Sequence, residues 1–169
     1  MTIIIRPMTL DDLEQVHTID TLSFSLPWPK NSYRFELLQN PGSSCLVAEI
    51  QSPPEASRIV GMIVTWNIVD EAHIATLAVH PEYRRQGIGE KLLAVVLEDA
   101  HRKGMKTATL EVRAQNTPAQ ALYQRFGFTV VGCRSRYYQD NQDDAIIMSL
   151  SSLEPEYLSR INSGGQGEG

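Results

Sequence analysis

Hydrophobic residues follow two patterns along the chain. Some form short runs rich in β-branched residues or alternate with polar residues, which predicts strands, and others recur every three or four positions, which predicts amphipathic helices. Strands are predicted at residues 3–5, 45–50, 59–69, 73–79, 107–112, 129–138 and 144–150. Helices are predicted from a capping Thr9 or Asp11 to about Leu22, and at residues 31–39, 88–103 and 117–126.

The order of these elements is β-α-α-β-β-β-α-β-α-β-β. The long strands 59–69 and 73–79 meet near Asp70-Glu71 and are expected to form a hairpin. Strands and helices that mix in this way predict a mixed sheet with helices on its faces, of the α/β or α+β class.

Composition narrows the classes of protein. The chain has 169 residues, which fits one domain, and 42% of them are hydrophobic, which is too many for a wholly disordered chain. The final letters SGGQGEG are polar and rich in glycine, and we expect this end of the chain to be disordered. The net charge is −5, which argues against a general nucleic-acid binder.

Cysteines and histidines offer little for metal binding. The chain has two cysteines, which excludes a disulfide scaffold and a cysteine-rich zinc site, and its four histidines form no HxH or HxxxH pair. We expect no metal, and we expect Cys45 and Cys133 to be small buried side chains. No hydrophobic run approaches the roughly 20 residues that span a bilayer, so neither a membrane partner nor a secretory segment is expected and the predicted location is cytoplasmic.

The most informative stretch is ATLAVHPEYRRQGIGEKLL, residues 75–93. A strand ends at Val79, and the loop 84–89 then opens the long helix. Glycines allow a ligand to approach the backbone, the first helical turn offers unpaired N–H groups with a positive dipole end, and two arginines add charge. These features favour a phosphate or pyrophosphate ligand. The alternative is a plain glycine turn with solvated arginines, because a bare GxG is a weak signal.

The loop also resembles a known signature. R-R-Q-G-I-G after a strand is similar to the Q/R-x-x-G-x-G/A motif of the GNAT superfamily of N-acetyltransferases. LEVRAQNTPAQALYQRFGF (110–128), RYYQDNQDDAIIMSL (136–150) and LPWP (26–29) resemble the ribosomal-protein-alanine N-acetyltransferase group, called RimI. The resemblance implies a single GNAT-like domain over residues 1–152, with a mixed, mostly antiparallel sheet flanked by helices on both faces, followed by a tail at 153–169.

Acetyl transfer to an amine requires a base, an oxyanion donor and an acid for the departing thiolate. By the resemblance, Glu111 is the base and Tyr123 is the acid. The pattern alone favours a different interpretation, in which Glu111 is a charge on a solvated strand face that it shares with Thr109 and Tyr123 is a packed tyrosine of its helix.

The resemblance also assigns binding residues. The acetyl-coenzyme A site is implied to comprise Leu77, Ala78, Val79, Arg84, Arg85, Gln86, Gly87, Ile88, Gly89, Glu90 and Asn116, with an N–H near Val79 as oxyanion donor. Asn116 could instead cap the following helix. The acceptor site is implied to include Trp28, Tyr137 and Tyr138, for which the alternatives are a packing tryptophan and edge-strand aromatics.

The function expected from the resemblance is N-alpha-acetylation of a protein, at the N-terminal alanine of a small-subunit ribosomal protein, by direct transfer in a ternary complex. No cysteine or serine with an activating base is visible to carry the acetyl group. One alternative is an acetyltransferase for a small-molecule amine or a lysine side chain, and another is a non-catalytic coenzyme A sensor. The oligomeric state is not readable from the sequence.

Overall fold

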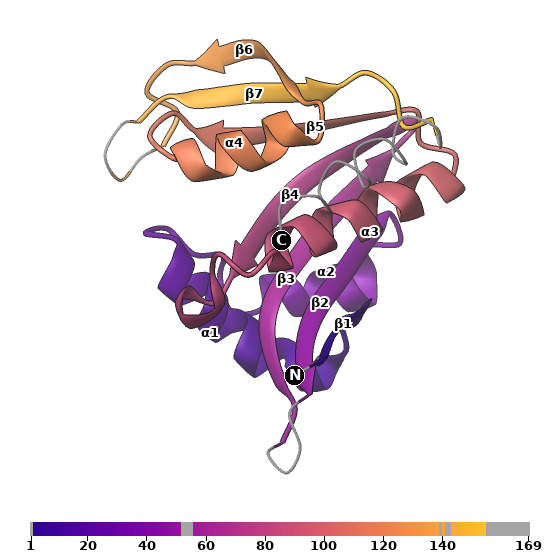
Figure 1. The fold of residues 1–169 in the computed structure, drawn as a ribbon, viewed down its shortest axis with the longest axis vertical. Coiled ribbons are helices and arrows are strands. Elements are labelled where there is room, and N and C mark those ends of the chain that lie inside the picture. The colour runs from indigo at the N-terminus through magenta and orange to yellow at the C-terminus, as the bar shows by residue number, and fades with distance from the viewer. Residues whose placement is uncertain (1, 52–55, 139, 141–142, 155–169) are drawn as a thin grey trace. The chain divides into compact units, whose positions relative to one another are not determined.

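Seven strands and four α-helices follow one another in the part of the chain that the structure describes (Figure 1). The structure is a computed structural model that describes residues 2–51, 56–138, 140 and 143–154. The elements are β1 (Thr2–Pro7), α1 (Leu13–Ser23), α2 (Ser32–Gln39), β2 (Ser43–Gln51), β3 (Arg58–Ile68), β4 (Glu71–Val79), α3 (Ile88–Arg102), β5 (Thr107–Arg113), α4 (Thr117–Arg125), β6 (Thr129–Arg134) and β7 (Ala145–Leu150). Their order is the predicted one, and the end of the predicted tail, residues 155–169, lies outside the described residues.

The strands are hydrogen-bonded in the order β1-β2-β3-β4-β5-β7-β6. The pairs β1–β2, β2–β3, β5–β7 and β6–β7 are antiparallel, whereas β4 and β5 are parallel over Glu71–Ile74 and Thr107–Leu110. A parallel pair requires a crossover connection, and α3 provides it. The mixed, mostly antiparallel sheet confirms the predicted fold class.

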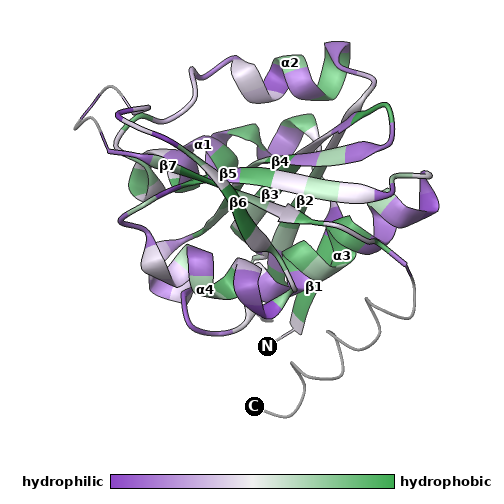
Figure 2. Cartoon of the chain, turned by 90° about the horizontal axis from the view of Figure 1, so that it is seen from above, coloured by the Kyte–Doolittle hydropathy of each residue, from purple (hydrophilic) through white to green (hydrophobic). Residues whose placement is uncertain are grey.

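The chain divides into two compact units. Unit 1 comprises Met1–Trp66 and Thr76–Val96, and unit 2 comprises Asn67–Ala75 and Leu97–Gly169. Both β4 and α3 contribute a part to each unit. Hydrophobic and hydrophilic residues are interleaved along α3 (Figure 2), as its period of three to four predicts. Its buried side chains are Ile88, Leu92, Leu93, Val96, Leu97 and Ala100.

In unit 1, a close approach at Gly61 fixes the beginning of α3. A Cβ atom on Gly61 would lie 3.0 Å from Leu92 Cδ1 and 3.3 Å from the Ala78 carbonyl oxygen. The glycine in β3 therefore lets the first turns of α3 and the end of β4 pack tightly against it. This packing holds the segment from which the loop 84–89 leads.

A charged cluster holds the N-terminal part of unit 1. Arg6 donates to both oxygens of Asp12, at 2.8 and 2.9 Å, and its Nε donates to Glu49 at 2.9 Å. Asp12 also forms a capping box with Thr9 around the 3-10 turn Leu10–Asp12, so Thr9 rather than Asp11 caps this turn, and Asp12 itself is the N-cap of α1. Burial alone would raise the pKa of Asp12, but the hydrogen bonds from Arg6 and Thr9 outweigh it and lower the pKa.

In unit 2, β5, β7 and β6 lie side by side with α4 beside them (Figure 1). Ala108, Leu110 and Val112 of β5 are buried, and the residues between them are half-buried, as the alternating pattern predicts. β6 is the outermost strand and is mostly exposed, so the expectation that Cys133 is buried is wrong, while Cys45 in unit 1 is buried. The β6–β7 register shifts between Val130 and Gly132, which marks a bulge.

The predicted strand 129–138 is too long. β6 ends at Arg134, and Arg136 adopts a positive φ of 52° that a strand does not use. The N–H of Arg136 donates to the Asp144 carboxylate at 2.9 Å instead of to a neighbouring strand. Tyr137 and Tyr138 therefore lie in the connection between β6 and β7, not in an edge strand.

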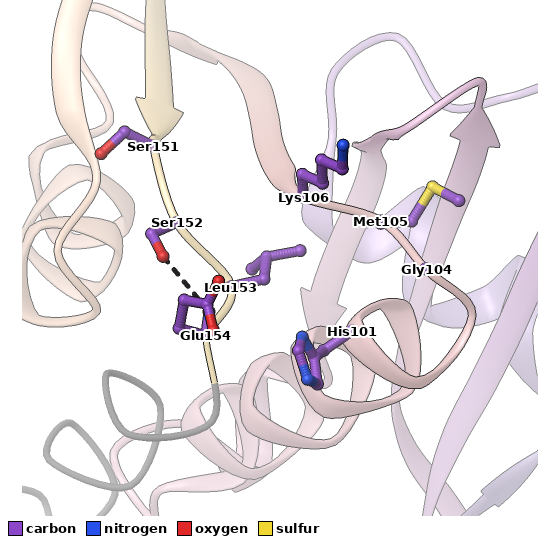
Figure 3. Close-up of a pocket in the computed structure, with 8 residues that line it drawn as sticks. All are labelled: His101, Gly104, Met105, Lys106, Ser151, Ser152, Leu153 and Glu154. Atoms are coloured by element: carbon purple, nitrogen blue, oxygen red, sulfur yellow. Dashed lines mark hydrogen bonds between the residues drawn. The ribbon is translucent and has the colours of Figure 1, made fainter.

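A cavity of about 300 Å³ opens in unit 2 at the end of α3. Figure 3 shows the residues that line it, which come from the last turn of α3, the α3–β5 connection and the segment after β7: His101, Gly104, Met105, Lys106, Ser151, Ser152, Leu153 and Glu154. None of the predicted site residues lines this cavity.

None of the helices, as far as the structure describes them, is long and hydrophobic enough to cross a membrane.

Candidate active site

The loop before α3 has the backbone geometry of a phosphate-binding turn. Arg85 and Gly87 have positive φ angles of 64° and 77°, and α3 begins directly after them. The first intrahelical bond joins the Lys91 N–H to the Gly87 carbonyl at 3.1 Å, so the N–H groups of the preceding turn point out of the helix end. A Cβ on Gly87 would meet nothing within 4 Å, and Arg85 and Gln86 are exposed. An anionic group fits these donors and this open space.

Arg84 is held by the protein itself. Its Nε donates to the Val79 carbonyl at 3.1 Å, and its Nη2 lies 3.3 Å from the Ser23 hydroxyl. The side chain thus ties the loop to the end of β4 and to α1, all within unit 1. The predicted cofactor residues of β4 are Leu77–Val79. They lie beyond Ile74, where the parallel ladder with β5 ends.

Trp28 packs within unit 1. It is half-buried, its ring stacks on Tyr33 at 5.0 Å and on Trp66 at 6.1 Å, and its backbone N–H donates to the Asp20 carboxylate at 2.9 Å. These contacts are those expected of a packing tryptophan, and the part of the side chain that is not buried leaves room for a role toward an acceptor.

Asp20 is a residue that the sequence analysis did not single out. Its side chain is fully buried, Oδ2 accepts from Trp28, and Oδ1 has no hydrogen-bond partner. Burial raises the pKa of this carboxyl group. The available signal was an acidic residue at the helical spacing of Val16 and Ile19, on the hydrophobic face of α1.

Glu111 lies on the half-buried face of β5 in unit 2. It is paired with Ile147 of β7, and its side chain is 22% exposed, with Oε1 3.5 Å from Arg134 Nη2. The strand fixes the backbone of this carboxylate, because β5 has partners on both sides. The carboxylate therefore has a defined direction, partial contact with solvent and a cationic neighbour in Arg134.

Tyr123 is buried on α4. Its ring packs edge-on against Phe128 with centroids 5.8 Å apart, so the interpretation as a packed tyrosine is correct as far as the ring is concerned. Burial and the neighbouring Tyr138 raise the pKa of the Tyr123 phenol. The hydroxyl therefore keeps its proton at neutral pH, as a proton donor must.

Two arginines, both missed by the sequence analysis, hold the β6–β7 connection. Arg113 donates to both oxygens of Asp140 at 2.9 Å, and its Cζ lies 3.9 Å from the centre of the Tyr138 ring. Arg134 lies 5.4 Å from the centre of the Tyr137 ring. Arg113 could have been noticed as the last residue of the LEVR motif, but its partner lies 27 positions away in the sequence.

Unit 2 brings four predicted site residues into one environment. Burial raises the pKa of Tyr138, and the charge of Glu111 raises it further, while Arg113 opposes them. Tyr138 thus interacts with Glu111 as well as with Tyr123, and its ring meets Tyr137 edge-on at 5.2 Å.

Asn116 caps α4. Its side-chain oxygen accepts from the Ala119 N–H at 3.2 Å, so the alternative role considered for this residue is present in the structure. No group of three or more potential metal ligands occurs among the residues that the structure describes.

Comparison with known proteins places the chain in a family. The profile of the acetyltransferase (GNAT) family matches residues 13–128. The chain belongs to this family of acetyltransferases, whose co-substrate is acetyl-coenzyme A.

Three similar proteins add detail. A candidate [ribosomal protein bS18]-alanine N-acetyltransferase of Bacillus subtilis (strain 168) is 40% identical over 150 residues, which cover 89% of this chain and 96% of that protein. The crystal structure of the ribosomal-protein-S18-alanine N-acetyltransferase from Escherichia coli matches with a TM-score of 0.79 and 30% identity, over 92% of this chain and 97% of that one. The structure of the NatC complex bound to Gag peptide and CoA matches with a TM-score of 0.76 and 28% identity, over 89% and 99% of the two chains.

Proposed function

We propose that this acetyltransferase transfers the acetyl group of acetyl-coenzyme A to the N-terminal alanine of ribosomal protein bS18. The relatives named for this reaction span nearly the whole chain, which supports the acceptor class. A ribosomal protein as acceptor agrees with a cytoplasmic location, which is part of the proposal. One structural observation carries the chemistry: β5 fixes the Glu111 carboxylate with 22% of its side chain exposed, and α4 holds Tyr123 as a buried, protonated phenol.

The donor side of the proposal rests on unit 1. The N–H groups at the beginning of α3 and the side chain of Arg85 would bind the diphosphate of the co-substrate, with Gln86, Gly87, Ile88, Gly89 and Glu90 forming the turn around it. Arg84, held by the Val79 carbonyl, would fix the loop. Leu77–Val79 of β4, beyond the ladder with β5, would offer backbone groups to the extended arm of the co-substrate and an N–H to the developing oxyanion.

The acid–base groups come from unit 2. An α-amino group has a pKa of about 7.7–8.0, so near neutral pH a carboxylate needs to remove only one weakly held proton. Glu111 would take that proton, directly or through water, and Tyr123 would donate its phenolic proton to the departing thiolate. Acetyl-coenzyme A would supply the thioester, and the amine would attack its carbonyl carbon directly, so that the acetyl group passes to the acceptor without an acyl-enzyme.

The acceptor side would be formed by aromatic residues. Tyr137 is 45% exposed and Tyr138 half-buried, and both sit on a connection that Arg113 and Asp140 anchor. Trp28 stays a predicted acceptor residue, and its ring contacts with Tyr33 and Trp66 lie within unit 1. Asn116 would contact the co-substrate in addition to capping α4.

The test is an acetylation assay read by intact mass. We expect one added acetyl group on a peptide that begins with alanine, and none on the same peptide with a blocked N-terminus and an internal lysine, or on a polyamine. Glu111→Gln and Tyr123→Phe should each lower kcat by about 100-fold or more, which is the usual contribution of an acid or base. Glu98→Gln, an exposed acidic residue on α3, is the matched control and should retain full activity.

Two results contradict the proposal. Acetylation of the blocked peptide or of the polyamine in preference to the free N-terminus would assign the enzyme to lysine or small amines. Near-full turnover by both Glu111→Gln and Tyr123→Phe would remove the assigned roles.

A further inference from the structure

The face of unit 2 that carries Glu111 also carries two arginines. In the β5–β7–β6 ladder, Arg113 and Arg134 are both paired with Ala145. Glu111 is paired with Ile147, two positions further along β7. Paired residues, and residues two apart along a strand, lie on the same face of a sheet. Since Ala145 is small, it leaves room above it for the long side chains on either side.

The two arginines are held very differently. Arg113 makes two hydrogen bonds of 2.9 Å to Asp140 and lies over the Tyr138 ring. Arg134 lies 5.4 Å from the centre of the Tyr137 ring, and its ion pair with Glu111 spans 3.5 Å, longer than the 2.7–2.9 Å usual for a charge-assisted hydrogen bond. Its side chain is 55% exposed. Arg113 is therefore fixed, whereas Arg134 can leave Glu111 at little cost.

The chemistry of this contact resembles that of the acceptor. At neutral pH a protein N-terminus is largely an ammonium group, a cation with N–H donors, which is what the Arg134 guanidinium presents to the carboxylate. Of the other ionisable groups on this face, Arg113 is engaged by Asp140, Tyr138 is a phenol, and His73 lies opposite Thr109, two positions along the ladder from Glu111.

We propose that Arg134 occupies the Glu111 carboxylate in place of the acceptor's α-ammonium group, and that an incoming N-terminus displaces it. The proposal rests on Glu111 being the residue that receives the acceptor, as in the proposed function. Arg134 is then a positioning and selecting residue: it holds the carboxylate side chain in place while the site is free of acceptor. On displacement, the guanidinium stays beside the exposed ring of Tyr137, 5.4 Å away.

The pairing is tested by NMR of the arginine side chains, with the Arg134 signal identified by its loss in Arg134→Lys. Glu111→Gln should shift the Arg134 guanidinium signal, and a peptide with a free N-terminal alanine should shift it in the same direction in the unmodified enzyme. The N-acetylated form of that peptide should leave it in place. The signal of Arg113 serves as internal control and should not respond to Glu111→Gln.

Kinetics test the consequence. An exposed ion pair changes an equilibrium by about fivefold at most, so Arg134→Gln should lower the KM for the acceptor peptide about two- to fivefold without changing the KM for acetyl-coenzyme A. Arg134→Lys, which keeps the cation, should resemble the unmodified enzyme. A purely structural role would lower kcat or thermal stability and would not improve acceptor binding.

Three results would overturn the displacement. They are an Arg134 signal that ignores Glu111→Gln, an acetylated peptide that moves the signal as the free peptide does, and an acceptor KM that rises in Arg134→Gln. The response to Glu111→Gln needs no substrate, so it stands even if the acceptor is not an N-terminal alanine. Absence of acetylation of any N-terminus would instead refute the proposed function.

Discussion

The guanidinium of Arg113 lies 3.9 Å from the centre of the Tyr138 ring while both oxygens of Asp140 bind its nitrogens. A residue at the end of β5 thus fixes an aromatic residue and an acidic residue of the β6–β7 connection at once. Lysine carries the same charge but cannot make the planar, two-pronged contact.

We therefore expect Arg113→Lys to raise the KM for the acceptor peptide about tenfold, equivalent to about 1.4 kcal/mol. Asp140→Asn should also raise the KM for the acceptor peptide, but by less, because the amide keeps one oxygen that can accept from Arg113. Steady-state kinetics measure both, and calorimetric titration of coenzyme A, which should be unchanged, is the control. An unaltered acceptor KM in Arg113→Lys would show that Tyr138 takes no part in acceptor binding.

Gly87 offers a test of the co-substrate loop with a control in the same chain. Gly87 and Gly104 both have positive φ angles, 77° and 88°, and a Cβ on either would meet nothing within 4 Å. Alanine at either position costs about 1–2 kcal/mol of backbone strain. We expect both Gly87→Ala and Gly104→Ala to lower the melting temperature by a similar amount, and only Gly87→Ala to weaken coenzyme A binding, by about tenfold or more, in a calorimetric titration. Equal affinity in the two variants would remove the loop from the binding site.

The raised pKa of Tyr123 predicts the alkaline behaviour of the enzyme. An ordinary phenol has a pKa of about 10, and burial together with Tyr138 raises that of Tyr123 above it. The phenol remains a proton donor throughout the physiological range. With both substrates saturating, kcat should show no falling limb up to about pH 10. A limb below that pH in the unmodified enzyme that disappears in Tyr123→Phe would mean that the phenol loses its proton earlier.

Asp20 predicts a gain in stability. Its pKa is raised by burial, so this group contributes stability that is fully present below the unfolded value of about 3.9 and is lost as the pH rises through the folded value. Wherever this buried carboxyl is ionised, its charge costs stability. Asp20→Asn removes the charge and keeps an oxygen for the Trp28 N–H, and should raise the free energy of unfolding at pH 7 by about 1 kcal/mol. Asp20→Leu, which removes that oxygen as well, should be destabilising, and denaturant unfolding compares the two.

Asp12 predicts the opposite pH dependence. Its pKa is lowered in the folded state, so its contribution is present above about pH 3.9 and is lost as the pH falls through the folded value. Arg6→Met leaves a buried carboxylate without its partner and should cost about 3 kcal/mol at pH 7. The difference from the unmodified protein should shrink as the pH falls from about 3.9, the unfolded value, through the lower folded value at which Asp12 becomes protonated. A difference that is independent of pH would point to lost packing of the Arg6 chain instead.

Local patterns predicted much of the fold. The spacing of Leu92 and Leu93 with their neighbours gave α3, and Gly104 ends it with the positive φ expected just after a helix. The alternation around Leu110 and Glu111 gave β5 and its two faces. These elements are predictable because their residues obey one period from end to end.

The relationships within the site depend on contacts that no local pattern encodes. Tyr137 and Tyr138 have high strand propensity, yet Arg136 turns the chain through a positive φ and Asp144 binds its N–H. The partners of Arg113 and Arg134 lie on other elements, so that their pairing follows from strand register. The roles of Glu111 and Tyr123 could be proposed because a motif names them, while the buried Asp20 belongs to no motif.

The bulge between Val130 and Gly132 has a consequence for the protein at high concentration. β6 is the outermost strand and exposes Val130 and Val131, a hydrophobic pair on an open row of backbone hydrogen-bonding groups. A regular edge strand of this kind can form backbone hydrogen bonds with a strand of another chain. The extra residue interrupts the spacing of those groups and bends the border, so that the sheet ends there and the chain is guarded against self-association into fibrils.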